Sequence, residues 1–200
     1  MSIKITYKTG SNEKSIKNYV LFSDEEFKIN GLSKLSISKN SNQISKTITS
    51  NKSKKKNIIS FNLNPDQKII LIKIKNKLTA TENEKKGASF YNYLKSNLIF
   101  DVTFLNKNTT STQNKNSAFF DEFLHGMQLK SYNFNKYKTK QDVKIIDITI
   151  LNSKKIKNKK KFDRFSSILE GTNYTKDLVS EPGNILHPDE YAKRLLQLRK

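Results

Sequence analysis

Apolar residues alternate with polar ones at the start of the chain, where Ile3, Ile5 and Tyr7 each follow a polar residue. This period of two is typical of a strand that buries one face. The run at 68–74 (KIILIKI) is almost continuously apolar, which predicts a strand buried on both faces in a parallel or mixed sheet covered by helices. The predicted strands span residues 3–7, 19–22, 58–63, 68–74, 98–105 and 143–151.

Between these strands, apolar residues recur at the spacing of a helix. One helix is expected to begin after Thr79 or Thr81, either of which can cap it, and to run to about Lys95. Residues 32–48 show a weaker helical pattern interrupted by serine and asparagine, so we expect a weak helix with a flexible middle there. The apolar face of the helix that ends at about Lys95 would hold Ala80, Ala88, Tyr91 and Leu94.

A second clear helical pattern follows a polar stretch at 106–114, which we expect to be a loop. Asn116 or Ser117 would cap this helix. Strand, helix, strand, helix and strand therefore follow one another from 68 to 151, which is the order of an α/β fold with a mixed sheet flanked by helices. One side of the second helix carries Phe119, Phe120, Phe123, Leu124 and Met127.

The end of the chain is predicted to be helical and to lie outside this sheet. A basic run at 154–161 (KKIKNKKK) leads into a connecting helix at about 160–180. Pro182 and Gly183 end that helix, because proline lacks a hydrogen-bond donor and glycine tolerates a positive φ. The stripe on the connecting helix that should pack against a neighbour consists of Phe162, Phe165, Ile168, Leu169 and Leu178.

The composition excludes several classes of protein. The chain has 200 residues, a formal net charge of +20, 34% hydrophobic residues and no cysteine. Without cysteine there is no disulfide framework, zinc finger, iron–sulfur cluster or thiol catalysis. No apolar run reaches the roughly 18 residues that span a bilayer, and residues 1–8 lack the apolar core of a signal peptide. A cytoplasmic protein with no membrane partner is therefore expected.

The positive charge comes almost entirely from lysine, since only Arg164, Arg194 and Arg199 are arginine. Proteins that read bases or clamp phosphates rely on the planar fork of arginine. Lysine, asparagine and isoleucine, all encoded by A/T-rich codons, are abundant, which favours a solvated lysine surface as the source of the charge. Weak binding of polyanions at 154–161 is the alternative.

Motifs for common catalytic chemistry are missing. The chain has no GxGxxG or GxxxxGK[ST] phosphate loop and no HExxH or GxSxG motif. Its two histidines are expected to be structural, because His125 lies in the phenylalanine-rich helix and His187 precedes Pro188 at a helix start. Asp189 and Glu190 would then face the positive end of that last helix.

Two further groups of residues suit chemistry but have simpler explanations. Acidic residues adjoin one another at three places, yet neighbours in sequence point in different directions on a helix, so we expect turn and cap roles. Aromatic and basic residues interleave at 130–140, a pattern that suits stacking on single-stranded nucleic acid. An ordered loop whose aromatic rings pack on the sheet is the favoured interpretation. The acidic groups are Asp24, Glu25 and Glu26, Asp121 and Glu122, and Asp189 and Glu190; the mixed group is Lys130, Tyr132, Phe134, Lys136, Tyr137, Lys138 and Lys140.

Two segments carry a family resemblance. Residues 123–140 (FLHGMQLKSYNFNKYKTK) contain a glycine before a leucine-rich turn and then Tyr-x-Phe-x-x-Tyr-Lys. Residues 162–198 contain a helix followed by Lys-Asp-Leu-Val-Ser-Glu-Pro-Gly-Asn and then a proline. Both resemble the leucyl aminopeptidase family, the M17 metallopeptidases, from whose pattern Lys176, Ser180 and His187 depart. The matching residues of the first segment are Gly126, Leu129, Tyr132, Phe134, Tyr137 and Lys138.

The resemblance implies a macrodomain-like N-terminal α/β domain at 1–153, a basic linker and interdomain helix at 154–181, and the start of a catalytic domain at 182–200. It implies that the parent protein removes N-terminal residues from peptides with two divalent metal ions, Mn or Zn, and assembles as a homohexamer. The family's catalytic and metal-binding residues lie in the catalytic domain, and its Asn-Thr-Asp-Ala-Glu-Gly-Arg motif is absent here. No catalytic, metal-binding or cofactor-binding residue is therefore expected in this segment, whose role would be structural and assembly-supporting.

Two rival functions stay open on the sequence. A nucleic-acid-binding module agrees with the net charge of +20, and some members of the family bind DNA through this domain. A free-standing macrodomain-like ligand binder is the other rival, and the missing glycine-rich phosphate loop counts against it.

Overall fold

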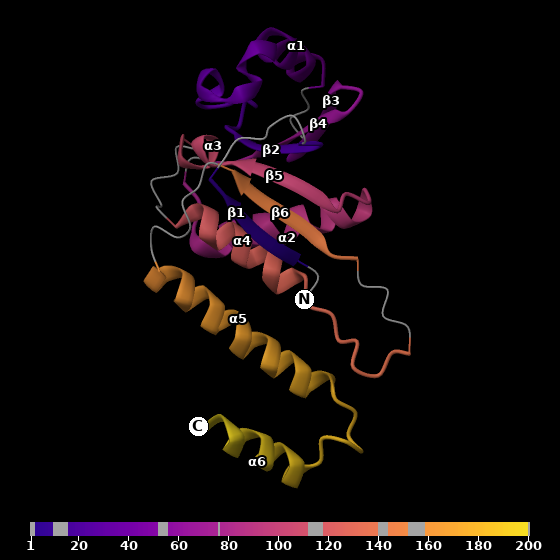
Figure 1. Cartoon of the computed structure of the whole chain (residues 1–200). Helices are drawn as coiled ribbons and strands as arrows, with labels where there is room; N and C mark the ends of the chain where they lie inside the picture. The colour runs from indigo at the N-terminus through magenta and orange to yellow at the C-terminus, as the bar shows by residue number, and fades with distance from the viewer. Residues whose placement is uncertain are drawn as a thin grey trace.

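The computed structural model describes residues 3–9, 16–51, 56–75, 77–111, 118–139, 144–151 and 159–199. These residues form an α/β fold in which one six-stranded sheet lies between two layers of helix (Figure 1). The predicted fold class, a mixed sheet flanked by helices and followed by a connecting helix, is confirmed. The strands are β1 (Ile3–Lys8), β2 (Asn18–Ser23), β3 (Ile58–Asn64), β4 (Gln67–Lys73), β5 (Asp101–Leu105) and β6 (Ile146–Leu151).

The strands follow one another across the sheet in the order β1-β6-β5-β2-β4-β3, and every pair is parallel except the β3–β4 hairpin. Strand β4 is buried on both faces, as its apolar run predicts. Ile70 and Ile72 contribute to one core, and Ile69 and Leu71 contribute to the other. The core on the first side includes buried residues from the strands and from the helix that begins near residue 119: Ile70, Ile72, Ile99, Val102, Phe104, Phe119, Phe123, Ile146 and Ile148.

Helix α2 (Ala80–Ser96) begins at the predicted cap. The Thr79 hydroxyl accepts a hydrogen bond from the Glu82 backbone N–H, and the Glu82 carboxylate accepts one from the Thr79 backbone N–H, which completes a capping box. The predicted buried face is confirmed at Tyr91 and Leu94 and is wrong at its start, because Ala80 is exposed and Ala88 is only half-buried. The buried residues of α2 are Asn83, Gly87, Phe90, Tyr91 and Leu94.

Helix α4 (Phe119–Lys130) packs on α2 with almost no space between the two backbones. A Cβ atom added to Gly87 would lie 1.9 Å from the carbonyl oxygen of Phe123, and one added to Gly126 would lie 2.0 Å from that of Glu84. Both distances are far below van der Waals contact, so only glycine fits at either position. The helices therefore meet backbone to backbone at two glycines, one from each helix.

The start of α4 differs from the prediction. Ala118 occupies the N-cap position and makes no side-chain capping bond, while Asn116 and Ser117 lie outside the described residues. The apolar side of the helix is confirmed: its phenylalanines form an aromatic cluster with Phe22, whose ring lies 5.2 Å from that of Phe123 in an edge-on arrangement. Aromatic packing and the contact with α2 thus hold a helix that begins without a side-chain cap.

Strand β5 starts at Asp101 rather than at residue 98, because the turn that ends α2 takes up the intervening residues. The backbone N–H of Leu98 bonds to Lys95, and that of Ile99 bonds to Leu94. This pairing closes the helix with Leu98 at φ 54, where glycine is usual. The Leu98 side chain is 72% exposed, so it contributes little packing in return.

The second face of the sheet is covered by shorter elements than expected. The weak helix expected at 32–48 is two 3-10 turns, η2 (Leu32–Lys34) and η3 (Ser36–Asn40), followed by α1 (Ser41–Asn51). Part of the loop expected at 106–114 is a short helix, α3 (Asn106–Ser111). Leu35, Ile37 and Ile44, all within the segment expected to be a weak helix, are buried against the sheet.

The chain ends in two helices on the far side of α4 from the sheet, α5 (Lys159–Ser180) and α6 (Pro188–Leu196), with a final turn, η4 (Gln197–Arg199) (Figure 1). Among the described side chains of α5, Leu169 and Leu178 are buried, whereas Ile168 from the predicted stripe is exposed. Helix α6 buries none of its residues. Within the described residues, no helix is both long and apolar enough to cross a membrane.

The glycine contact leads to a stability prediction. Gly126→Ala should lower the free energy of unfolding by about 3 kcal/mol, because the new methyl group must push the α2 backbone away. Gly171→Ala is the matched control, since a Cβ atom there meets nothing within 4 Å. As an alanine inside a helix, it should stabilise the chain by up to about 1 kcal/mol. Equal effects in urea denaturation would contradict the proposed backbone contact.

Candidate functional site at the Glu181 junction

His125 is a packed helix residue, as expected. Its side chain is 3% exposed, and its Nδ1 atom lies 2.9 Å from Oε1 of Glu84 on α2. The ring also contacts that of Phe165 on α5, with 4.9 Å between the ring centroids. His125 therefore helps to hold three helices together: its own α4, α2 through Glu84, and α5 through Phe165.

His187 is at the N-cap of α6, as predicted, but its side chain makes no capping bond. Asp189 and Glu190 lie in the first turn, where carboxylates interact favourably with the helix dipole. Asp24 has the expected turn role, because it accepts from the backbone N–H groups of Glu26 and Lys28. Glu122 differs from the expectation, because it is buried and accepts from the Asn83 amide of α2.

Among the residues that the structure describes, no three His, Asp or Glu side chains come close enough to hold a metal ion. The absence of catalytic and metal-binding residues from this segment stays a prediction.

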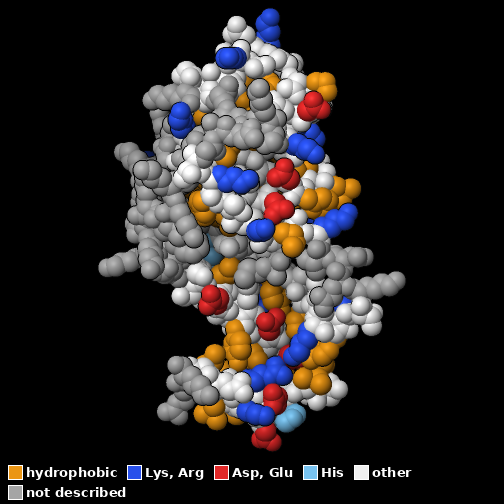
Figure 2. Space-filling view, viewed as in Figure 1, with side chains coloured by type: hydrophobic (Ala, Val, Ile, Leu, Met, Phe, Trp, Pro, Cys, Tyr) orange, Lys and Arg blue, Asp and Glu red, His pale blue; other side chains and the backbone are white. Residues whose placement is uncertain are grey.

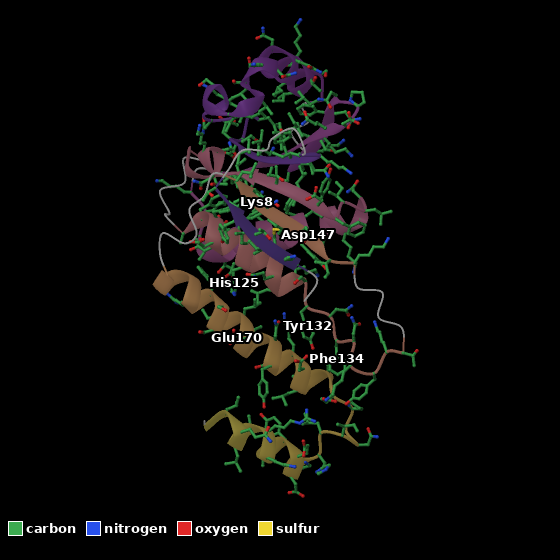
Figure 3. The ribbon with its side chains drawn as sticks, in the orientation of Figure 1. Lys8, His125, Tyr132, Phe134, Asp147 and Glu170 are labelled. Atoms are coloured by element: carbon green, nitrogen blue, oxygen red, sulfur yellow. The ribbon has the colours of Figure 1, made fainter. Side chains whose placement is uncertain are left out.

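The aromatic loop at 132–137 is ordered, but its rings do not pack on the sheet as expected. The Tyr132 hydroxyl donates to Oδ1 of Asp177 at 2.8 Å, and the Lys176 ammonium lies 5.1 Å from the centre of the Tyr132 ring. The Phe134 and Tyr137 rings contact each other edge-on, with 5.7 Å between centroids. The loop therefore packs on the C-terminal end of α5, which lies more than 40 residues further along the chain (Figure 3).

One carboxylate joins this loop to the last helix. Glu181 follows α5 directly, and its side chain is only 1% exposed. It accepts hydrogen bonds from the Lys136 ammonium, the Tyr137 hydroxyl and Nη1 of Arg194, the last at 3.1 Å. Bonding by Lys136, then by Tyr137 and Arg194, lowers the pKa of Glu181 to about 2. Glu181 with these three donors is called the Glu181 junction below.

Additional contacts fix both sides of the junction. Arg194 also donates from Nε to Glu190 at 3.0 Å, and its backbone carbonyl accepts from the Tyr174 hydroxyl at 3.1 Å. A cavity of about 410 Å³ opens beside these groups, with Phe134 and Leu178 among its apolar lining residues. Figure 2 shows basic, acidic and hydrophobic side chains close together over α5 and α6. The arrangement is suited to holding helices at a fixed angle.

A second place for a ligand would be the crevice at the carboxyl ends of β2 and β5, where the order of the strands reverses. The side chain of Asn108 fills this position. Its amide accepts from the Phe22 backbone N–H at 2.7 Å and donates to the Phe22 carbonyl at 3.1 Å, and the residue is fully buried. Asn108 thus continues the pairing of β2 beyond the end of β5, which weakens the case for a free-standing ligand binder.

Comparisons with known proteins agree with this geometry. No protein-family model matches the chain. A probable cytosol aminopeptidase of Sinorhizobium fredii is 37% identical over 86 residues, which are 40% of this chain and 17% of that protein. Over this stretch the chain is similar to the cytosol aminopeptidases. The resemblance predicted from residues 123–140 and 162–198 is thereby confirmed.

The fold of this chain is similar to part of several solved aminopeptidase structures. A mutant of tomato leucine aminopeptidase matches 98% of this chain and 42% of its own, with 16% identity and a TM-score of 0.67. A bottromycin maturation enzyme in complex with Mn matches 92% of this chain and 36% of its own, with 11% identity and a TM-score of 0.60. The chain thus spans less than half of each structure and about a sixth of the curated relative.

The Glu181 junction leads to a pH prediction. The usual value of 4.5 applies to this carboxyl in the unfolded chain, and the pKa is about 2 in the folded one. Its contribution to stability is therefore complete above about pH 4.5 and is lost as the pH falls through about 2. Amide exchange of 174–181, corrected for intrinsic rates, should be slower in the wild type than in Glu181→Gln at pH 6, and this difference should disappear near pH 2.

Glu170→Gln is the control for this pH prediction, because Glu170 is an exposed carboxylate of α5, the helix that Glu181 directly follows. It should leave exchange at 174–181 unchanged across the pH range. A difference between wild type and Glu181→Gln that stayed constant with pH would show that the charge of Glu181 is not what holds the junction.

Proposed function

We propose that this chain is the N-terminal portion of a leucyl-aminopeptidase-like metallopeptidase that removes N-terminal residues from peptides. The observation that carries the proposal is the unequal coverage. The fold match takes in 98% of this chain but only 42% of tomato leucine aminopeptidase. In this proposal, residues 1–153 form the α/β domain, 154–181 form a basic linker and interdomain helix, and 182–200 begin the catalytic domain.

The role proposed for this segment is structural. Its α/β domain carries α5, and the Glu181 junction orients α6 with respect to it. Helix α6 exposes several large apolar side chains, which would be buried once a catalytic domain is formed around them. These side chains are Tyr191, Leu195 and Leu196, with Leu198 just beyond the helix.

The finer features of the family are part of the same proposal. They are two divalent metal ions, Mn or Zn, a homohexameric assembly and a cytoplasmic location. One matching structure is described as a complex with Mn, which supports metal dependence. The described residues of this segment do not provide a suitable set of metal ligands, so the metals are proposed to bind outside it. No step of the reaction is therefore assigned to residues of this chain.

The alternative of a nucleic-acid-binding module has no comparable support. On the face drawn in Figure 2, the Lys and Arg side chains are interspersed with acidic ones instead of forming one continuous patch. The aromatic residues that interleave with lysines are engaged with α5 and Glu181. Rings held in this way cannot stack on bases without first leaving the junction.

The first test of the proposal is an activity measurement on this segment. The purified 200-residue chain should not hydrolyse leucine p-nitroanilide in the presence of Mn or Zn above the rate with metal alone, because it supplies no two-metal site. Turnover by the segment that a chelator abolishes would contradict the assignment. The same measurement on the Sinorhizobium fredii relative serves as the positive control.

A chimaera tests the structural role directly. Residues 1–200 would replace the corresponding portion of the Sinorhizobium fredii relative, and we expect a folded assembly with metal-dependent release of leucine. Its mass in solution would show whether a hexamer forms. A chimaera with folded α/β domain but no assembly and no activity, beside an active parent, would count against the proposed role.

A further inference from the structure

The loop at 132–137 and helix α6 share a partner, although they come from parts of the chain more than 50 residues apart. Lys136 and Tyr137 donate to the Glu181 carboxylate from the loop, and Arg194 donates to it from α6. Since the Glu181 side chain is 1% exposed, water cannot readily replace a donor that is lost. The orientation of this carboxylate is therefore set by all three donors together.

We propose that Tyr137 and Lys136 are positioning residues for α6. They hold the Glu181 carboxylate in the orientation in which it accepts from Arg194, and so they fix the angle of a helix that neither of them bonds. A carboxylate has about four acceptor positions, so it can receive donors from opposite sides at once. The bonds from Lys136 and Tyr137 restrict the rotation that a glutamate side chain otherwise retains. Less conformational freedom of Glu181 is therefore lost when Arg194 binds as the third donor.

Helix α6 is sensitive to such an effect because it buries none of its residues. Among the described residues, its contacts with α5 and with Glu181 include two polar ones, Arg194 with Glu181 and the Tyr174 hydroxyl with the Arg194 carbonyl. A small loss of order at Glu181 should therefore reach α6, while the buried sheet should not change.

The tyrosine tests this coupling better than the lysine. Lys136 and Arg194 carry like charges beside the same carboxylate, so removing Lys136 also removes a repulsion that opposes Arg194. Tyr137→Phe removes only a neutral hydroxyl and keeps the ring that contacts Phe134. Tyr132→Phe is the matched control, because it removes a hydroxyl of the same loop that bonds to Asp177 instead of Glu181.

The experiment measures amide exchange of residues 190–196 in the 200-residue chain, with β4 as the internal reference. Tyr137→Phe should speed exchange in α6 by about two- to tenfold, within the range shown by coupled neighbours. Tyr132→Phe should leave α6 unchanged. In a Glu181→Gln background, adding Tyr137→Phe should have a smaller effect than it has alone, because the carboxylate through which it acts is gone.

Equal effects of Tyr137→Phe and Tyr132→Phe on α6 would overturn the proposal, since loosening of the loop as a whole would then explain both. So would an unchanged α6 in Tyr137→Phe, or full additivity with Glu181→Gln. If Tyr137→Phe also speeds exchange in β4, Lys136→Met is compared instead with Lys138→Met, an exposed lysine of the same segment. A larger effect on α6 from Lys136→Met supports the proposal, and equal effects contradict it.

Discussion

The backbone contact between α2 and α4 is the constraint on which the rest of this structure depends. Gly87 and Gly126 each leave room for a carbonyl of the opposite helix, which lets the two helices approach more closely than side chains would permit. This approach allows the buried pair Asn83 and Glu122 to bond across the interface at 2.7 Å. It also places His125 on the outer side of α4, where α5 packs. The close approach at Gly87 and Gly126, which have no side chain, thus contributes to where the C-terminal helices lie.

The two segments that carry the family resemblance are the two sides of one contact. Residues 132–137 supply the loop, and the end of α5 with α6 supplies the surface on which it lies. The interleaved aromatic and basic residues, a pattern that suits stacking on nucleic acid when it is taken alone, thereby acquire a structural explanation. Burying a carboxylate such as Glu181 is unfavourable unless it is paired, and the two segments bring it three donors, Lys136, Tyr137 and Arg194.

Much of the sheet can be predicted from local pattern, because an apolar run such as that of β4 is compatible only with burial. The cap of α2 is also a local feature, since Thr79 and Glu82 are three residues apart. The buried face of α2 cannot be predicted in this way. Asn83 is polar and Gly87 is small, and both are buried only because α4 supplies Glu122 and a carbonyl at those points. The Glu181 junction is equally hidden, because its donors lie about 45 residues before Glu181 and 13 residues after it.

Lys176, near the C-terminal end of α5, stands where the family pattern that the sequence resembles usually has arginine. Its ammonium donates to a single acceptor, the Leu129 carbonyl at 2.9 Å, and lies over the Tyr132 ring. Neither contact needs a planar fork with two parallel donors, so lysine can meet both. Arg194 is different, because it donates from Nη1 to Glu181 and from Nε to Glu190, and a guanidinium has donors for both carboxylates. At these two positions of the joint between α5 and α6, lysine therefore serves one carbonyl and arginine serves two carboxylates.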